Sequence, residues 1–241
     1  MGMKRLLDIV VSFTGLVLLA PLLIVVMLLV WRQDWSSPLY IAPRVGRGGQ
    51  LFNMIKLRSM VISADKSGVE STSSSDQRIT PLGHFIRRYK LDELGQLWNV
   101  LVGEMSLVGP RPNTRAGTNV YTVEEQKLLS IKPGITDFAS IVFSDEGEIL
   151  RDQVNPDQTY DQLIRPWKSR LGLLYVENNS LLLDVQLIIY SVIAVASKNY
   201  ALNQVVKRLR ELGAEEDIVA VAQRKSALQP TSPPGASDIS T

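Results

Sequence analysis

An uncharged, mostly apolar run from Ile9 to Trp31 constrains the fold of this chain more than any other stretch. About 20 consecutive apolar residues suffice for a helix to cross the hydrocarbon core of a bilayer, and this run is longer. A secretory signal would have a shorter apolar core and a small-residue cleavage site, whereas Pro21 follows Ala20 directly here. We therefore expect residues 1–35 to form a membrane-inserted helix that is retained in the protein.

The geometry of this helix depends on Pro21 and on the charges at its two ends. Pro21 lacks the backbone N–H that would bond the Val17 carbonyl, so a bend is expected there. Basic residues flank the run on both sides: Lys4, Arg5, Arg32, Arg44 and Arg47. Positive charge gathers on the cytoplasmic side of membrane helices, so both ends are expected in the cytoplasm. A re-entrant helix satisfies this expectation, and a spanning helix with a proline kink is the alternative.

The composition excludes several classes of protein. With 241 residues, the chain is long enough for one catalytic domain with appendages. It has no cysteine, which excludes disulfides, thiolate catalysis and cysteine-bound zinc. A net charge of +2 gives no argument for a nucleic-acid partner, and we expect none. A pI near 8.8 is compatible with contacts to anionic headgroups or phosphates.

Two adjacent acids, Asp92 and Glu93, open the most informative stretch, residues 90–112. Apolar residues follow at helical spacing, which predicts a helix with one buried face: Leu91, Leu94, Leu97, Trp98 and Leu101. The acids should lie in or just before its first turn, near the positive end of the helix dipole. Taken alone, such a pair most often only favours helix initiation.

Cations occur close to the acids in the sequence. Lys56 and Arg58 follow a short strand expected at residues 51–55, and one intervening residue places them on the same face, where they could grip a diphosphate. Arg111 lies between Pro110 and Pro112, which hold its backbone rigid and suit it to bidentate phosphate contact. A helical pattern at residues 78–89 ends in Arg87 and Arg88, immediately before the dyad.

The run KLDELGQLWNVLVGEMSLVGPRP at 90–112 resembles the signature of the monotopic phosphoglycosyl transferases, a family of bacterial sugar transferases. The likeness extends to KLRSM at 56–60, RITPLGHFIRR at 78–88, PGIT at 133–136 and YVENNS at 175–180, and ends near Ala196. Three departures stand out. Lys90 replaces a Ser or Thr, the Gly-Trp-Ala-Gln after PGIT is replaced by DFAS at 137–140, and Gly172 replaces an acid.

The resemblance implies transfer of a sugar-1-phosphate from a UDP-sugar to a polyprenyl phosphate, with release of UMP, as the first membrane step of surface glycan assembly. In the family, the aspartate at the position of Asp92 forms a covalent intermediate, and Glu93 with Asp92 would hold Mg²⁺. The substrate-binding residues implied are Lys56, Arg58, Arg87, Arg88, Pro110 and Arg111. The alternatives are a membrane-anchored, non-catalytic scaffold protein that retains the fold and an unrelated enzyme on a spanning anchor.

The expected fold is α+β and mostly helical, with a small cytosolic catalytic domain, the re-entrant helix and interfacial amphipathic helices. We place the catalytic domain at residues 36–200, amphipathic helices at 201–226 and a disordered tail at 227–241. The apolar segment at 181–196 is too short to span a bilayer and should lie at the interface or in the core. The expected location is the cytoplasmic face of the bacterial inner membrane, with UDP-sugar, polyprenyl phosphate, membrane lipids and a possible second copy as partners.

Overall fold

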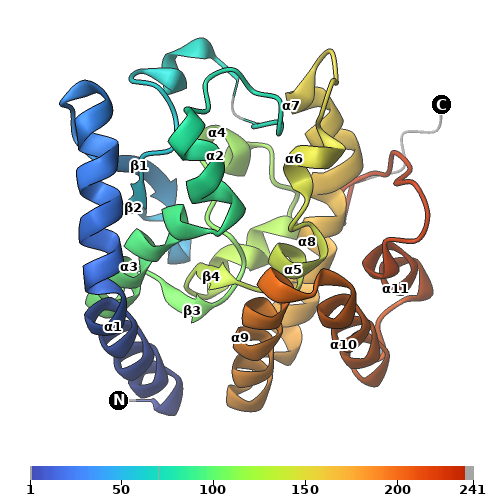
Figure 1. Ribbon diagram of the computed structural model, residues 1–241. Helices are drawn as coiled ribbons and strands as arrows, with labels where there is room; N and C mark the ends of the chain where they lie inside the picture. The colour runs from blue at the N-terminus through green and yellow to red at the C-terminus, as the bar shows by residue number, and fades with distance from the viewer. Residues whose placement is uncertain (1, 70, 237–241) are drawn as a thin grey trace.

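The computed structural model describes residues 2–69 and 71–236, and the protein is mostly helical with two small sheets (Figure 1). The α-helices are α1 (Met3–Asp34), α2 (Pro81–Arg88), α3 (Gln96–Val102), α4 (Arg115–Asn119), α5 (Phe138–Val142), α6 (Glu146–Ile149), α7 (Pro156–Thr159), α8 (Arg165–Asn178), α9 (Leu181–Ala196), α10 (Lys198–Glu211) and α11 (Glu216–Gln223). The strands are β1 (Leu39–Val45), β2 (Leu51–Leu57), β3 (Ser106–Val108) and β4 (Gly134–Thr136). Short 3₁₀ segments are η1 (Arg47–Gly49), η2 (Ala64–Ser67), η3 (Leu91–Gly95) and η4 (Glu125–Ser130), and η5 (Tyr160–Ile164) is a π-turn.

The apolar run forms the single long helix α1, which contains Pro21 and changes direction near its middle in Figure 1. This helix is long and apolar enough to cross a membrane, and few of its apolar side chains are buried. Its N-terminal half turns a polar side chain inward: Asp8 is buried and accepts hydrogen bonds from Ser106 Oγ at 3.0 Å and Leu107 N at 2.9 Å. α1 is therefore docked on the globular part of the protein along one face.

Two small sheets organise the middle of the chain. β1 and β2 form an antiparallel hairpin, with Leu39 opposite Leu57 and Val45 opposite Leu51. β3 and β4 pair in parallel, with Ser106 opposite Gly134 and Val108 opposite Thr136. The ends of this pair approach so closely that a Cβ atom on Gly134 would lie 2.1 Å from the backbone nitrogen of Gly109. Glycine is required there because any side chain would force the backbones apart.

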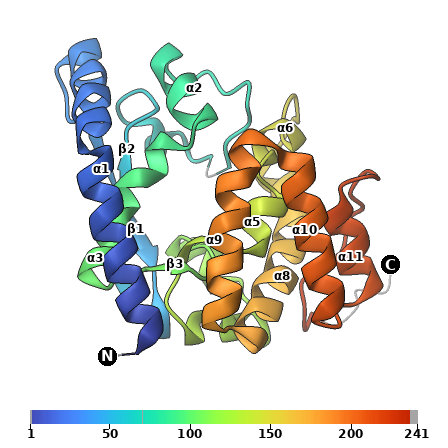
Figure 2. The same ribbon diagram turned by 60° about the horizontal axis from the view of Figure 1, so that its bottom comes forward.

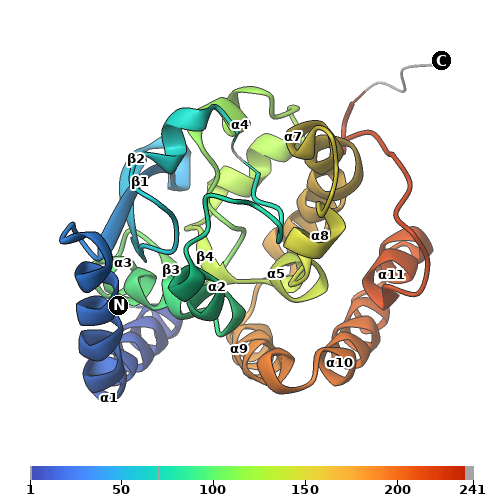
Figure 3. The same cartoon turned by 45° about the horizontal axis from the view of Figure 1, so that its top comes forward.

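The C-terminal helices α10 and α11 belong to the same core as the rest of the domain. Apolar residues of α10 and α11 are buried against α5, α8 and α9: Ala201, Leu202, Val205, Leu209, Ile218, Val219 and Ala222. Figure 3 shows α9, α10 and α11 following one another around α5 and α8. Within the segment 201–226, α10 and α11 are helical, and the apolar face of the amphipathic pattern packs against the rest of the protein.

Part of the segment expected to be a disordered tail is placed against the domain. Leu228 packs on the core, and Thr231 N donates to the carbonyl of Gln162 at 3.2 Å. Thr122 Oγ1 donates to the carbonyl of Pro234 at 2.6 Å. Residues 237–241, which share that expectation, lie outside the described residues.

α9 combines one buried face with one exposed apolar face. Leu183, Asp184 and Leu187 are buried. The opposite face exposes apolar side chains at helical spacing: Leu182, Val185, Ile189, Val192 and Val195. α1 and α9 lie on the same side of the molecule (Figure 2).

Candidate active site

The two acids lie on η3, a 3₁₀ turn between α2 and α3 (Figure 1). Lys90, directly before it, adopts a left-handed conformation with φ of 55° and supplies no side-chain cap. At the other end of the turn, a Cβ on Gly95 would lie 3.0 Å from the carbonyl oxygen of Ile55. This glycine lets the dyad turn pack directly on β2, the strand that carries Lys56.

Asn99 on α3 fixes the dyad turn to β2, and its role was not predicted. It is buried, and its Oδ1 accepts from Ile55 N at 2.9 Å while its Nδ2 donates to the Asn53 carbonyl at 2.8 Å. Nδ2 also donates to Glu104 Oε2 at 2.6 Å. Asn99 thus bonds the β2 backbone as a neighbouring strand would. An asparagine inside an apolar helical pattern is the sequence signal that could have indicated this role.

Glu93 and Arg111 form a two-pronged ion pair across the site. Arg111 Nη2 donates to Glu93 Oε1 at 2.9 Å, and Nη1 donates to Glu93 Oε2 at 3.2 Å. Nη1 also donates to the carbonyl of Ile135 on β4. Burial acts to raise the pKa of Glu93, but Arg111 and the nearby lysines outweigh it and hold the pKa below its ordinary value. Glu93 is therefore ionised and oriented.

Asp92 is in a different environment, although it is the next residue in the chain. Its Oδ1 is shielded from solvent and has no hydrogen-bond partner among the described residues. Burial, followed by the negative charge of Glu93, raises the pKa of Asp92, whereas the charges of Lys56, Arg87 and Lys90 act to lower it. A buried carboxylate oxygen without a partner is costly, and such atoms occur at sites that bind a ligand or react.

Lys56, at the end of β2, lies within electrostatic reach of the dyad. Burial, helped by the positive charge of Arg111, lowers the pKa of Lys56 to about 8, while the charges of Glu93 and Asp92 act in the opposite direction. A lysine with a depressed pKa beside two carboxylates is typical of functional sites. The structure thus brings Lys56, Arg111 and the two acids together.

Of the other predicted cations, Arg87 also acts on the dyad, whereas Arg88 and Arg58 contact other residues. Arg87 donates from Nε to Ser59 Oγ at 2.9 Å, and its charge acts on Asp92. Arg88 is exposed and stacks on Tyr89, with its guanidinium carbon 5.8 Å from the ring centre. Arg58 forms an ion pair with Asp34 at the end of α1, with Nη2 of Arg58 2.6 Å from Oδ1 of Asp34.

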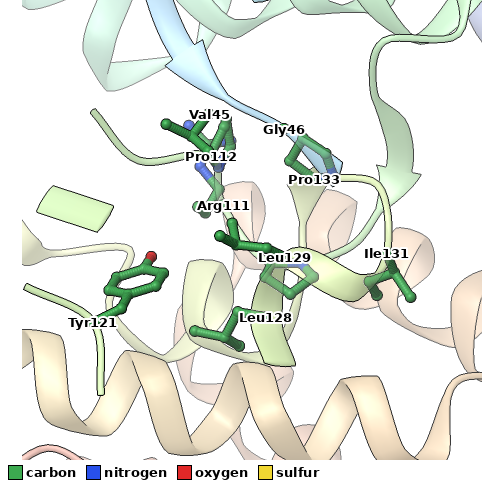
Figure 4. Close-up of a pocket in the computed structure, with 10 residues that line it drawn as sticks. Val45, Gly46, Arg111, Pro112, Tyr121, Leu128, Leu129, Ile131 and Pro133 are labelled. Carbon is green, nitrogen blue, oxygen red and sulfur yellow. The ribbon is translucent and has the colours of Figure 1, made fainter. Parts of the chain in front are cut away.

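The Pro110–Pro112 turn carries Arg111 over a small, mainly apolar cavity. The cavity measures about 10 Å³ and is lined by Val45, Gly46, Pro110, Arg111, Pro112, Tyr121, Leu128, Leu129, Ile131 and Pro133 (Figure 4). Gly172 on α8 borders the same region, because a Cβ there would lie 2.8 Å from Leu128 Cδ2. An acid at this position would displace Leu128. With a volume of about 10 Å³, this space is too small for a sugar.

The carboxylates of Asp92 and Glu93 are the candidate ligands for Mg²⁺. Within residues 2–69 and 71–236, no cluster of three or more His, Cys, Asp or Glu side chains is arranged to hold a metal ion. Mg²⁺ is often bound by only one or two carboxylates together with substrate phosphates and water. The partnerless Oδ1 of Asp92 next to the carboxylate of Glu93 fits that kind of site.

One predicted helix face was wrong. Trp98 was expected on the buried face of α3, but 52% of it is exposed. The buried residues of α3 are instead Gln96, Leu97, Asn99 and Val100. Trp98 consequently faces outward on a helix that packs beside α1.

The site is an acid pair among lysine and arginine side chains, in a protein whose helix α1 is long and apolar enough to cross a membrane. The chain matches the family described as bacterial sugar transferase over residues 1–198, and it belongs to that family. The match ends at the start of α10, in agreement with the sequence expectation that the likeness ends near Ala196.

Several curated proteins are similar to this chain. The undecaprenyl-phosphate glucose phosphotransferase of Komagataeibacter xylinus is 38% identical over 196 residues, which cover 78% of this chain and 35% of that protein. A UDP-glucose:undecaprenyl-phosphate glucose-1-phosphate transferase of Caulobacter vibrioides is 34% identical over 172 residues, covering 68% of this chain and 64% of that protein. A putative undecaprenyl-phosphate N-acetylgalactosaminyl 1-phosphate transferase of Bacillus subtilis is 41% identical over 124 residues, covering 52% and 69%. The chain thus spans about a third of the length of the first of these relatives.

Proposed function

We propose that this protein transfers a sugar-1-phosphate from a UDP-sugar to a polyprenyl phosphate and releases UMP, as the first membrane step of surface glycan assembly. The observation that carries the proposal is the partnerless carboxylate oxygen of Asp92, held among Lys56, Arg87 and Lys90. The names of the relatives, which describe undecaprenyl-phosphate sugar phosphotransferases, support the same reaction.

In the proposed reaction, Asp92 is the nucleophile. One of its carboxylate oxygens attacks the phosphorus that bears the sugar, and the bond from that phosphorus to the oxygen of UMP breaks. The product is an acyl phosphate that joins Asp92 to the sugar phosphate. An oxygen of the polyprenyl phosphate then attacks the same phosphorus, and the carboxylate of Asp92 leaves. Two displacements replace one, as covalent catalysis generally does.

The surrounding cations lower the electrostatic barrier to this attack. An anionic carboxylate approaching a diphosphate is repelled by its oxygens, so fixed positive charge must face them. Lys56 and Arg111 are the side chains that would supply it, because both act electrostatically on the dyad. Mg²⁺, held by Asp92 and Glu93, would supply further positive charge to the phosphate oxygens when bound.

We propose that this reaction takes place at the cytoplasmic face of the bacterial inner membrane, where a soluble UDP-sugar can meet the acceptor lipid. Both α1 and α9 expose apolar side chains, and the two helices lie on the same side of the molecule (Figure 2). In the proposed arrangement these exposed apolar side chains face the bilayer. Burial of apolar side chains in the interface stabilises such an orientation. The UDP-sugar would enter from the cytoplasm and the polyprenyl phosphate from the membrane.

The proposal is tested by intact-protein mass spectrometry after the purified protein is mixed with a UDP-sugar and Mg²⁺ but no lipid acceptor. We expect a mass increase equal to one sugar phosphate, together with one equivalent of UMP. Asp92→Asn keeps the shape of the side chain and should lose both signals. Asp157→Asn, which changes an acid on α7 outside the dyad, is the matched control. If Asp92→Asn retains most of the turnover with lipid present, direct attack by the lipid phosphate replaces this mechanism.

A further inference from the structure

Arg111 and Asp137 leave the same end of the parallel β3–β4 pair. β4 ends at Thr136, directly before Asp137, and the Thr136 carbonyl accepts from Gly109 N at 3.0 Å. Arg111 lies just beyond Gly109 and bonds the Ile135 carbonyl of β4. Two ionic side chains of opposite sign therefore emerge from adjacent strand ends, the usual position for ligand-binding groups in a parallel sheet.

Asp137 is buried more deeply than either acid of the dyad, with 1% of the residue exposed. Its Oδ1 accepts from the backbone nitrogen and from the hydroxyl of Ser140, both at 2.7 Å, and so caps α5. These donors are neutral, and a buried carboxylate is costly without a positive charge nearby. Burial raises the pKa of Asp137, and the bonds from Ser140 and the positive charges of Arg111 and Lys168 oppose the rise.

The charges of three acids, Glu93, Asp137 and Asp92, act on Arg111 in the site. Glu93 takes both terminal nitrogens, and the charge of Asp137 adds to that of Glu93 in raising the pKa of Arg111 against the effect of burial. Under the proposed function, Glu93 must also face the metal. When Glu93 does so, it gives up part of its contact with Arg111. An arginine in this partly buried position would then need another counter-charge.

We propose that Asp137 is a positioning residue whose charge holds Arg111 in the site when Glu93 turns from the arginine to the metal. Arg111 stays anchored on the Ile135 carbonyl and keeps its free nitrogens available to the diphosphate. The inference rests on the proposed function, because it requires a metal at the dyad. Asp137 touches neither substrate nor metal in this role and acts through Arg111.

The test measures how Mg²⁺ alone changes the melting temperature of the purified full-length protein. Asp137→Asn is suited to it because asparagine caps helices as well as aspartate does and removes only the charge. Releasing Arg111 from Glu93 becomes more costly in this variant, so we expect the half-maximal Mg²⁺ concentration to rise by about fivefold, a typical coupling between neighbouring charges. The same substitution in an Arg111→Met background should cause no further rise.

Three controls give each outcome a definite meaning. Ser140→Ala keeps the charge of Asp137 and should leave the Mg²⁺ midpoint unchanged. Glu93→Gln should remove the Mg²⁺ response, and if it does not, the proposed metal ligand is wrong. If Glu93→Gln removes the Mg²⁺ response but Asp137→Asn leaves the Mg²⁺ midpoint unchanged, the inference about Asp137 is wrong while the proposed function stands. The inference is also wrong if Asp137→Asn raises the Mg²⁺ midpoint equally in the wild-type and Arg111→Met backgrounds. If Asp137→Asn fails to fold, Asp137→Ser, which also caps helices, carries the same expectation.

Discussion

Lys4 at the start of α1 lies 2.7 Å from the carboxylate of Asp184 on α9, so the first turn of the membrane-type helix is bound to the C-terminal half of the chain. Lys4 also donates to the Val108 carbonyl at 3.1 Å. The far end of α1 is bound as well, through the ion pair of Asp34 with Arg58. Both ends of the helix thus contact the same domain.

This arrangement gives the first prediction, which concerns topology. A helix whose two ends contact one domain should have both ends on the side of the membrane where that domain lies, as the re-entrant geometry requires. The chain has no cysteine, so single cysteines at Gly2 and Ser36 can be labelled separately in intact cells. We expect a membrane-impermeant maleimide to reach neither site until the cells are opened. Labelling of Gly2→Cys from outside would establish a spanning helix instead.

The second prediction concerns the pH dependence contributed by Lys56, whose pKa is lowered to about 8 by burial and by Arg111. Below this pH the amine is charged and can attract a phosphate, and above it the amine is neutral. We therefore expect kcat/KM, which reports the free enzyme, to fall as the pH rises through about 8. In Lys56→Arg, the guanidinium stays charged, so this alkaline decline should move to higher pH. Lys66→Arg, on the exposed segment before α2, should keep the wild-type profile.

The third prediction compares Arg111 with Arg58. Arg111→Lys keeps the charge but cannot bond both oxygens of Glu93 and the Ile135 carbonyl together, so we expect kcat/KM to fall by about 10- to 100-fold, as for the loss of one strong transition-state contact. Arg58 is instead paired with Asp34 at the end of α1, and its charge is not among those that shift the pKa values of Asp92 and Glu93. Steady-state assays should therefore show Arg58→Lys within about twofold of wild type, a change too small for a lost phosphate contact. A large rise in KM for the UDP-sugar in Arg58→Lys would show that Arg58 binds the substrate.

The fourth prediction concerns Asn99 and the stability of the site. Asn99→Ala leaves the backbone groups of Ile55 and Asn53 without their partner. Buried backbone groups that lose a partner cost about 1–3 kcal/mol each, so thermal unfolding in detergent should show a clearly lower midpoint. Asn119→Ala, at the exposed end of α4, should leave the midpoint unchanged. An unaltered midpoint in Asn99→Ala would mean that water replaces the amide.

Features of the site that depend only on residues adjacent in the sequence could be predicted from the sequence. Asp92 and Glu93 lie on one short turn, and the two prolines fix Arg111, so their chemistry could be inferred locally. The ion pair of Arg58 with Asp34 could not be predicted, because Asp34 belongs to α1 and no local pattern indicates that pairing. The asparagine within an apolar helical pattern signals a buried polar role for Asn99, but the pattern does not show that its partner is β2.

Two errors of fold prediction have a geometric cause. η3 is wound as a 3₁₀ turn, with about 3.0 residues per turn instead of 3.6. A face counted at α-helical spacing from Leu91 is therefore out of phase by the time it reaches Trp98, which is exposed. In α10, an apolar stripe beside basic residues predicts an interface, but it does not distinguish a lipid surface from the protein surface that α10 covers.

The buried Asp8 has a consequence for the modularity of this protein. Because its carboxylate accepts from Ser106 Oγ and Leu107 N, α1 completes the hydrogen bonding of β3 as well as supplying hydrophobic length. A transplanted membrane helix with only apolar residues would leave the Leu107 N–H without an acceptor. The anchor and the catalytic domain are therefore one folding unit, and chimeras that exchange anchors between relatives must carry this carboxylate with them.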